Sequence, residues 1–409
     1  MPRRPWVVAL AGSMLAATAF AAPAAAQGAA GDEGDRFIVV LKDSAGPGKV
    51  ADALDARARV SVGHVYRHAL RGFSARMPES RAAALERQSR VDYVQRDRKV
   101  SIQAQTLPTG VDRIDADLSP TADIDGSDER VNVDVAVIDT GVSLNHPDLN
   151  VHRQTNCALL GLNGNDQNGH GSHVAGTIGA LDNSSDVVGV APGARIWAVK
   201  VLNALGVGLN SDVICGIDYV TANAGQIEVA NMSLGGSGSD DGNCGNTGGD
   251  AMHQAICDSV GAGVTYAVAA GNDHQNSSGF TPAAYDEVIT VSALADFNGQ
   301  PGGGAASTCT SDVDDTFADF SNFGNDVDVI APGVCINSTW RGTGYNTVSG
   351  TSMASPHAAG AAALYKAQNP GASPAQVRTA LRNAGNTNWT WPSQDGDGVQ
   401  EPLINVGGF

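Results

Sequence analysis

The stretch VDVAVID, residues 133–139, is a short apolar run that ends in a carboxylate. Similar runs follow along the chain, with helical patterns between them at residues 211–224 and 248–262. Apolar runs that do not alternate with polar residues, and that are separated by helices, are typical of parallel strands covered on both faces. The sequence therefore predicts an α/β fold with a doubly wound, mostly parallel sheet, whose other strands are RIWAVKVL (195–202), VANMSL (229–234), VTYAVAAG (264–271) and VITVSAL (288–294).

Four polar residues occupy positions where such a sheet gathers its active site, at the carboxyl ends of its strands. Asp139 ends the first run and Asn272 follows the run at 264–271, while His170 and Ser352 each begin a predicted helix. Considered singly, Asp139 also suits a turn, and for Asn272 alone a turn is the better interpretation. We expect His173, three residues after His170, to have a structural role.

These residues together supply the parts of a nucleophilic serine site. A serine hydroxyl becomes a nucleophile when a base removes its proton, and the base needs a third group that holds its tautomer. Ser352, His170 and Asp139 can take these roles, in a chain order that excludes the α/β-hydrolase and chymotrypsin arrangements. The Asn272 amide and the Ser352 N–H can donate to a developing oxyanion. The small residues at 171–172 are expected to leave room for a substrate.

Five motifs in order carry a family resemblance: VAVIDTGV, NGHGSHVAGT, NMSLGG, AAGN and GTSMASPH. Together they resemble the subtilisin-like serine proteases, including the relatives of proteinase K, from about residue 104 to 406. The resemblance implies a three-layer subtilisin-like fold. It also implies that Ser352 is the nucleophile, His170 the general base and then acid, Asp139 its orienting group, and Asn272 part of the oxyanion hole.

The same resemblance implies a substrate cleft with two extended edges that pair with a peptide backbone. Its first specificity pocket would lie between residues 233–235 and 269–271, with Phe280 near its floor. Small, apolar walls without a buried charge predict uncharged, apolar residues at P1, the substrate position before the scissile bond. The predicted substrate-binding residues are Leu205, Gly206, Val207, Gly208, Ser233, Leu234, Gly235, Gly236, Ala269, Ala270 and Gly271.

Structural calcium is a further implication of the resemblance, because oxygen-only ligand sets suit Ca²⁺. Asp186 and Ser185 depart from the subtilisin pattern in the loop of the first site. A possible third site, DGDGVQE, offers Asp395, Asp397 and Glu401 but lacks the spacing of an EF-hand loop. The first site would use Gln105, Asp148, Asn183 and the carbonyls of Leu181, Ser185 and Val187; the second would use Asp328 and the carbonyls of Asp286 and Val288.

The N-terminal part of the chain has the features of an export signal followed by a propeptide. Two arginines, an apolar run and a small-residue cleavage site predict a signal peptide at residues 1–26, whereas the run is short for a membrane anchor. Residues 27–103 hold 14 Lys+Arg and 10 Asp+Glu, and the residues after Gln103 hold 9 and 33. Residues 27–103 resemble the ferredoxin-like inhibitor segment that precedes secreted subtilisin-type proteases. The resemblance implies that they form an α+β propeptide domain, removed by cleavage near Gln103, and that residues 104–409 form the catalytic domain.

The predicted strands and helices of this inhibitor domain follow the order strand, helix, strand, helix, strand. The helices are expected at KVADALDARARV (49–60) and ESRAAALERQS (79–89), and the strands at residues 36–42, 72–77 and 91–102. Six cysteines in an exported chain indicate three disulfides, for which 15 pairings are possible. The pairing we expect is Cys157–Cys215, Cys244–Cys257 and Cys309–Cys335.

The main hypothesis is a secreted, monomeric, calcium-stabilised endopeptidase that cleaves its own propeptide and many protein substrates. The acidic body argues against nucleic acid as a substrate and for bound cations. Two alternatives are a catalytically inactive scaffold of the same fold and a processing protease with few substrates. A complete set of triad residues argues against the first alternative, and shallow, glycine-lined subsites argue weakly against the second.

Overall fold

The computed structural model describes residues 36–42, 45–56, 60–97, 105–158, 162–391 and 395–409. The predicted signal peptide and the predicted cleavage region near Gln103 lie outside the described residues. The chain divides into two compact units, Met1–Ile102 and Gln103–Phe409, and each is described by itself. Within the described residues, no helix combines the length and the apolar character that crossing a bilayer requires.

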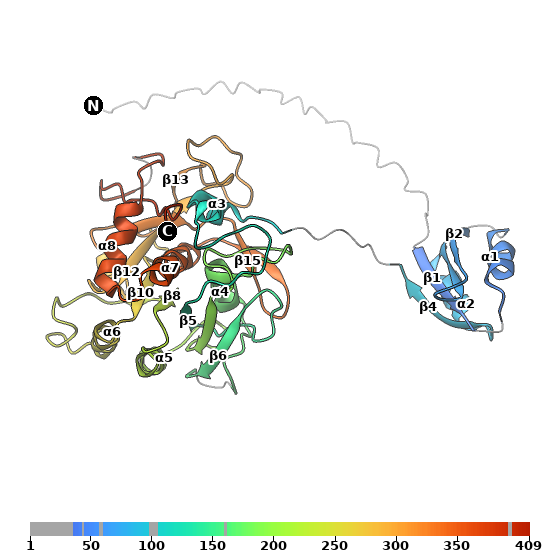
Figure 1. Ribbon diagram of the computed structural model, residues 1–409, viewed down its shortest axis with the longest axis horizontal. Helices are drawn as coiled ribbons and strands as arrows, with labels where there is room; N and C mark the ends of the chain where they lie inside the picture. The colour runs from blue at the N-terminus through green and yellow to red at the C-terminus, as the bar shows by residue number, and fades with distance from the viewer. Residues whose placement is uncertain (1–35, 43–44, 57–59, 98–104, 159–161, 392–394) are drawn as a thin grey trace, which may run out of the picture. The chain divides into compact units, whose positions relative to one another are not determined.

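The first unit is a four-stranded antiparallel sheet with two helices and its own apolar core (Figure 1). The strand order β2-β3-β1-β4 and the element order βαββαβ agree with the predicted ferredoxin-like domain. One strand was not predicted: the first helix ends at Asp55 rather than Val60, and β2 follows it. The elements are β1 (Arg36–Leu41), α1 (Pro47–Asp55), β2 (Ser61–Tyr66), β3 (Gly72–Arg76), α2 (Glu79–Glu86) and β4 (Val91–Arg96).

The second unit is built on a mostly parallel sheet, as the sequence predicts. Its strand order is β13-β12-β10-β8-β5-β7-β6, and β14 also pairs with β12. Among the described strands of this sheet, only β13 runs antiparallel to its neighbour. The strands are β5 (Asp134–Asp139), β6 (Val151–Asn156), β7 (Arg195–Lys200), β8 (Val229–Met232), β10 (Thr265–Ala269), β12 (Ile289–Ala295), β13 (Thr316–Phe317) and β14 (Val329–Pro332).

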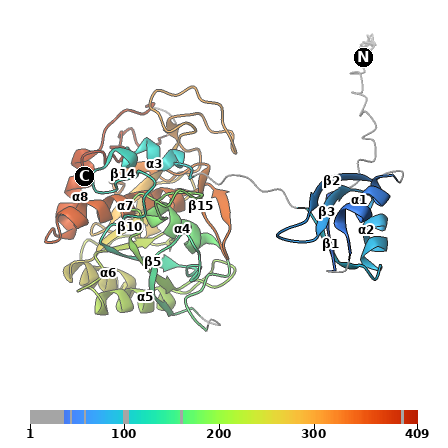
Figure 2. The same ribbon diagram turned by 45° about the vertical axis from the view of Figure 1, so that its right-hand side comes forward.

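Both faces of this sheet are covered by helices, which explains why its strands are apolar without alternation. On β5, Val135 and Val137 belong to one core cluster, whereas Ala136 and Ile138 belong to the other. Figures 1 and 2 show α5 and α6 together on one side of the sheet. The first face is packed by α4 (His170–Gly179), α7 (Thr351–Gln368) and α8 (Pro374–Ala384), and the second by α5 (Asn210–Ala222) and α6 (Ala251–Gly261).

Shorter elements and three disulfides complete the second unit. Bonds Cys157–Cys215, Cys244–Cys257 and Cys309–Cys335 confirm the predicted pairing. Pairs β9·β11 and β15·β16 are antiparallel. The short elements are α3 (Thr109–Arg113), η1 (Ala116–Leu118), β9 (Gly236–Ser237), η2 (Ser277–Gly279), β11 (Phe280–Thr281), β15 (Ile336–Thr339) and β16 (Tyr345–Val348).

Candidate active site

Asp139 and His170 form a short, largely buried pair. Asp139 is the last residue of β5 and is fully buried, and His170 is the first residue of α4 with 26% of its side chain exposed. His170 Nδ1 lies 2.8 Å from Oδ1 and 3.0 Å from Oδ2 of Asp139. A carboxylate on Nδ1 fixes the tautomer that leaves Nε2 as an acceptor, which is the arrangement a general base requires.

The electrostatic surroundings of His170 favour its protonated form. Burial lowers the pKa of His170, but the charge and hydrogen bond of Asp139, with the charge of Asp166, outweigh burial and leave the pKa raised. Asp166 is buried and accepts hydrogen bonds from the Ser172 hydroxyl at 2.7 Å and from the Gly169 N–H at 2.9 Å. It therefore also fixes the turn that introduces α4, a role that was not predicted from the sequence.

The small residues around His170 serve packing rather than substrate access, which corrects the prediction for residues 171–172. A Cβ on Gly171 would lie 2.1 Å from the Gly141 carbonyl, so this glycine lets α4 approach β5 closely. Ser172 is fully buried and bonded to Asp166. Gly169 has φ +118° and lies against Trp340, which leaves no room for a side chain. His173 is buried on the carbonyls of residues 336 and 346, the structural role predicted for it.

Ser352 lies in the first turn of α7, and a buried network fixes this turn against β8. Ser233 Oγ donates to the Ser352 carbonyl at 2.8 Å and accepts from the Asn231 amide at 2.9 Å. Ser355 in turn donates to Asn231 at 2.7 Å. The Ser352 hydroxyl donates to the Ser233 carbonyl at 3.4 Å, a weak hydrogen bond that leaves it free to turn. The described residues include no direct hydrogen bond between Ser352 and His170, and such contacts commonly tighten only with substrate bound.

Asn272 is oriented by its amide oxygen. Asn272 Oδ1 accepts from the Thr351 N–H at 2.8 Å and from the Thr351 hydroxyl at 2.9 Å, so its Nδ2 amino group points away from these partners and is available to donate. A Cβ built on Gly350 would lie 3.7 Å from the Ser352 N–H nitrogen and 3.8 Å from Asn272 Nδ2. Both nitrogens, with Asn272 Oδ1 at 3.7 Å, therefore lie beside Gly350, at the point where the proposed oxyanion hole needs two donors.

Two residues that hold Asn272 were not identified from the sequence. Thr351 accepts from the Gly271 N–H at 3.1 Å as well as donating to Asn272. Asn322 is fully buried, accepts from the N–H groups of Asp273 and Gln275 at 3.0 Å each, and donates to the Ala270 carbonyl at 2.9 Å. No local pattern marks Asn322, because its partners lie about 50 residues earlier in the chain.

Two adjoining hollows contain the predicted substrate residues. One, of about 440 Å³, is lined by His170, residues 206–210 and residues 233–237. The other, of about 370 Å³, is lined by residues 269–273, Phe280 and Ser352, and shares residues 234–237 and Thr281 with the first. Its walls are mainly small or apolar, and its one acidic lining residue, Asp273, is exposed. Leu205 lies at the rim, 84% exposed.

The residues predicted to hold a first calcium ion lie together. Asp148 is 2% exposed and accepts from the amide of Asn183 at 2.9 Å and from the Tyr345 hydroxyl at 3.3 Å. The Gln105 amide donates to the Leu181 carbonyl at 3.2 Å. In the same loop, Ser185 donates to Asn183 and Val187 forms a bridge with Thr106.

Asp148 has the environment of a carboxylate that lacks a counter-charge. Burial raises the pKa of Asp148 to about 7, and the charge of Asp186 adds to the rise. Within the described ranges, no lysine or arginine forms an ion pair with Asp148. Asp186, a departure from the subtilisin pattern, thus adds negative charge to this all-oxygen set, which fits a hard cation.

The second predicted calcium site is contradicted by an arginine. Arg378 Nε lies 2.6 Å from Asp328 Oδ1, and Arg378 Nη1 donates to the Asp286 carbonyl. Arg382 adds a second contact to Asp328 at 2.9 Å. A guanidinium group therefore supplies the positive charge where the resemblance placed Ca²⁺ on Asp286, Val288 and Asp328.

The possible third site is a cluster of carboxylates. One carboxylate oxygen from each of Asp395, Asp397 and Glu401 lies within 4.8 Å of the others. Glu401 is 2% exposed, and neither of its oxygens has a hydrogen-bond partner among the described residues. Burial and the charge of Asp395 raise the pKa of Glu401 to about 8. A buried, unpaired carboxylate beside two others favours a bound cation.

Known protein families match both units of the chain. The Subtilase family profile matches residues 130–399, which include Asp139, His170, Asn272 and Ser352. The chain belongs to the subtilase family. The Peptidase inhibitor I9 profile matches residues 36–103, so this subtilase has an inhibitor-type propeptide domain before its catalytic domain. It is a serine peptidase of the subtilisin type.

Individual relatives agree with this assignment. This subtilase is 37% identical over 377 residues to "Extracellular serine proteinase" of Thermus sp. (strain Rt41A), covering 85% of this chain and 83% of that one. It is 38% identical over 314 residues to "Subtilisin E" of Bacillus subtilis (strain 168), covering 76% and 74%. A solved cold-adapted subtilisin-like serine proteinase matches with a TM-score of 0.58 and 34% identity, over 73% of this chain and 97% of that one.

Proposed function

We propose that the protein is an extracellular endopeptidase, made as a zymogen that cuts off its own propeptide and then cleaves proteins of many sequences. The observation that carries the catalytic part is the short contact of His170 Nδ1 with Asp139, with Ser352 and Asn272 facing the same cleft. Export is supported by the N-terminal signal pattern of the sequence and by the "Extracellular serine proteinase" relative.

Each step of the reaction follows from the position of one side chain. His170 Nε2 takes the proton of the Ser352 hydroxyl as its oxygen attacks the scissile carbonyl carbon, forming a tetrahedral intermediate. The Asn272 amide and the Ser352 N–H donate to the oxyanion. Protonated His170, stabilised by Asp139, then donates its proton to the leaving amine, which leaves an acyl-enzyme on Ser352. A water molecule activated by His170 hydrolyses this ester.

The cleft supports broad sequence acceptance with an apolar preference at P1. Residues 205–208 and 233–236 offer backbone edges rich in glycine, which bind a peptide main chain whatever its side chains. The hollow between residues 234–237 and 269–273 has small walls, with Phe280 in its lining. Such a pocket favours an apolar side chain by burial alone, by about 1.5–3 kcal/mol.

A series of peptide substrates that differ only at P1 tests this specificity. We expect kcat/KM for phenylalanine and leucine at P1 to exceed that for lysine and glutamate by at least about tenfold, the lower end of the burial energy. Asp273→Asn is the matched variant, because its exposed carboxylate is the charge nearest to the pocket. A preference for lysine that Asp273→Asn abolishes would replace the apolar assignment.

Calcium would stabilise the folded enzyme and take no part in the chemistry. Two sites are supported by buried carboxylates that form no ion pair with a lysine or arginine among the described residues: the set of Asp148, Gln105, Asn183 and the carbonyls of residues 181, 185 and 187, and the cluster of Asp395, Asp397 and Glu401. Ions bound there would hold the start of the catalytic domain and its C-terminal segment. The site with Asp328 is not proposed, since Arg378 fills it.

The I9-type domain is proposed to act as chaperone and inhibitor of the catalytic domain, and the mature enzyme to act as a monomer. The basic character of residues 27–103 and the acidic character of the rest favour their association. Residues 27–103 added in trans should therefore inhibit the mature enzyme. The absence of inhibition at micromolar concentration would contradict this part of the proposal.

A further inference from the structure

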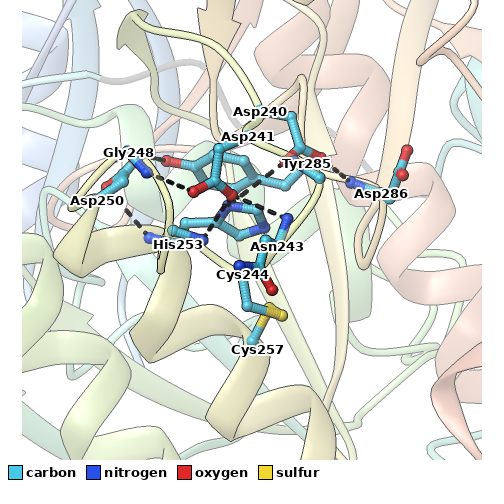
Figure 3. Close-up of polar contacts among 12 residues, drawn as sticks. Asp240, Asp241, Asn243, Cys244, Gly248, Asp250, His253, Cys257, Tyr285 and Asp286 are labelled. Atoms are coloured by element: carbon cyan, nitrogen blue, oxygen red, sulfur yellow. Dashed lines mark hydrogen bonds and ion pairs between the residues drawn. A yellow bond between two sulfur atoms is a disulfide. The ribbon is translucent and has the colours of Figure 1, made fainter.

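A loop beside the substrate cleft encloses an unusual group of side chains. The loop of residues 238–250 joins β9, which adjoins the predicted substrate edge at residues 233–236, to α6. Figure 3 shows Asp240 and Asp241 from this loop next to His253 on the first turn of α6, with the Cys244–Cys257 disulfide close by. The His253 side chain is 1% exposed, and its ring stacks on Tyr285 at 3.9 Å with the planes 4° apart. The position of His253 is therefore fixed.

The hydrogen bonding of His253 leaves one ring nitrogen unused. Its Nε2 lies 2.9 Å from Glu287 Oε2, and because a carboxylate only accepts, Nε2 carries a proton. In the neutral ring, Nδ1 is then unprotonated and has a free lone pair. This buried Nδ1 has no hydrogen-bond partner in the described part of the chain. A carboxylate on the far nitrogen is the arrangement by which metal-binding histidines are oriented.

Two carboxylate oxygens face this lone pair. Asp240 Oδ1 lies 3.6 Å from His253 Nδ1, and Asp241 Oδ1 lies 3.7 Å from it. These separations are too long for hydrogen bonds. Two ligands bound to one tetrahedral ion at about 2.0–2.2 Å would lie about 3.3–3.6 Å apart, so the observed distances are close to those of a shared metal.

Both carboxylates are held in place by the loop backbone. Asp241 accepts from the N–H groups of residues 243, 245, 247 and 248 at 2.7–2.9 Å. Asp240 accepts from the N–H of Gly242 at 2.6 Å and from that of Asp286 at 3.2 Å. Among the described residues, no lysine or arginine forms an ion pair with Asp240, Asp241 or Glu287. The carboxylates are thus held in place by the loop, and among the described residues the group of opposite charge that can contact them is the imidazole of His253.

We propose that His253 Nδ1, Asp240 Oδ1 and Asp241 Oδ1 bind one divalent transition-metal ion, with Zn²⁺ the best fit and water completing its coordination. One imidazole nitrogen with carboxylate oxygens suits Zn²⁺ and its neighbours, whereas Ca²⁺ prefers oxygen alone. Cys244 and Cys257 are joined to each other and offer no thiolate. The site is separate from the triad and from the proposed calcium sites.

An ion at this site would brace one wall of the cleft. The loop leaves β9 at Ser237, and Met252, next to His253, lines the larger of the two cleft hollows. The Asp286 N–H bonded to Asp240 belongs to the segment that follows the pocket residues Phe280 and Thr281. Zn²⁺ would therefore join the loop, α6 and this segment, and its binding should raise the thermal midpoint.

Metal binding to the full chain carrying Ser352→Ala, which cannot digest itself, tests this inference without measuring activity. The protein is freed of metal, saturated with Ca²⁺ to fill the calcium sites, and titrated with Zn²⁺ in a calorimeter. Bound zinc is then counted by mass spectrometry after dialysis. Further variants are Asp240→Asn, His253→Gln and, as the matched control, His152→Gln at an exposed histidine.

We expect the parent and His152→Gln to bind one Zn²⁺ more than Asp240→Asn and His253→Gln, and only the first two to gain several degrees in thermal midpoint. Co²⁺ in place of Zn²⁺ should give visible absorption bands that the Asp240→Asn and His253→Gln variants lose. Asp240→Asn keeps the shape of a partly exposed side chain, so it tests the site even where His253→Gln fails to fold. Equal zinc counts in the parent and Asp240→Asn would overturn the proposal.

Discussion

The imidazole Nδ1 of His170 lies between both carboxylate oxygens of Asp139, at 2.8 and 3.0 Å. The carboxylate is fully buried at the end of β5, whereas the imidazole reaches the cleft. The strand thus holds the charge away from water and the helix holds the base at the surface. Asp139 can therefore stabilise protonated His170 in a site from which water is excluded, while it does not itself contact the substrate.

Asp139→Asn should lower kcat about 10⁴-fold, the effect of losing the correct tautomer in such a triad. The reaction needs neutral His170, so activity falls as pH drops through the raised pKa of His170. Removing the Asp139 charge should move this acidic limb of the pH–rate profile to lower pH. Asp128→Asn, an exposed carboxylate, should leave the limb in place. An unmoved limb in Asp139→Asn would mean that another group titrates.

Asn272→Ala should lower kcat by about 10²–10³-fold with little change in KM, because its amide donates to charge that develops only in the transition state. Exposed Asn298→Ala, outside the cleft, serves as the control. Steady-state kinetics on one peptide substrate measures kcat and KM separately. A rise in KM with kcat unchanged would assign Asn272 to ground-state binding instead.

Asn322→Ala should act on the same step indirectly, as a positioning residue. It removes three hydrogen bonds that hold residues 270–275, so both the thermal midpoint and kcat should fall. The combined variant with Asn272→Ala should have nearly the kcat of Asn272→Ala alone, since Asn322→Ala displaces the donor that Asn272→Ala removes. Additive losses in the double variant would show that Asn322 acts elsewhere.

Stability should fall in acid because His357 is buried in its neutral form. Burial lowers the pKa of His357 to about 4, against an ordinary value near 6.5. The unfolded chain therefore takes up a proton first as pH falls, so this contribution is complete above about pH 6.5 and is lost toward pH 4. The free energy of unfolding of the Ser352→Ala protein, measured with denaturant, should be lower at pH 4.5 than at pH 7. His357 should account for roughly 2–3 kcal/mol of this difference.

A variant pair isolates the His357 contribution from other acid effects. Between pH 7 and pH 4.5, His357→Leu should lose roughly 2–3 kcal/mol less unfolding free energy than the parent. The exposed control His152→Gln should lose as much as the parent. The same acid loss in His357→Leu as in the parent would contradict the assignment to this residue.

Chelation of Ca²⁺ should lower the thermal midpoint, because an ion that binds only the folded state contributes about 2.7 kcal/mol when present at 100 times its Kd. Asp148→Asn and Glu401→Gln should each reduce the difference between calcium-loaded and chelated protein. Asp328→Asn should keep that difference, since Arg378 already neutralises Asp328. Scanning calorimetry with and without chelator is the measurement, and an unchanged midpoint in wild type would exclude stabilising calcium.

Much of the fold could be predicted from local pattern, because buried parallel strands and Ala-rich helices leave a strong signal in short stretches. The strand β2 was missed because SVGHVY follows a helix without a turn signal and none of its residues is buried. Asp328 matches the position of a calcium ligand in the sequence, but Arg378, 50 residues later in the chain, forms an ion pair with it. Asp166, Asn322 and the bare nitrogen of His253 likewise depend on contacts that only the folded chain brings together.

The central claim is that Ser352 is the nucleophile of a peptidase that matures itself, and intact-mass spectrometry of the expressed chain tests it most directly. Wild type and the control Ser127→Ala, at an exposed serine, should lose the residues up to about Gln103, whereas Ser352→Ala should retain them. Retention in Ser352→Ala with loss in the other two proteins is the predicted result. Loss of the propeptide from purified Ser352→Ala at the wild-type rate would contradict it.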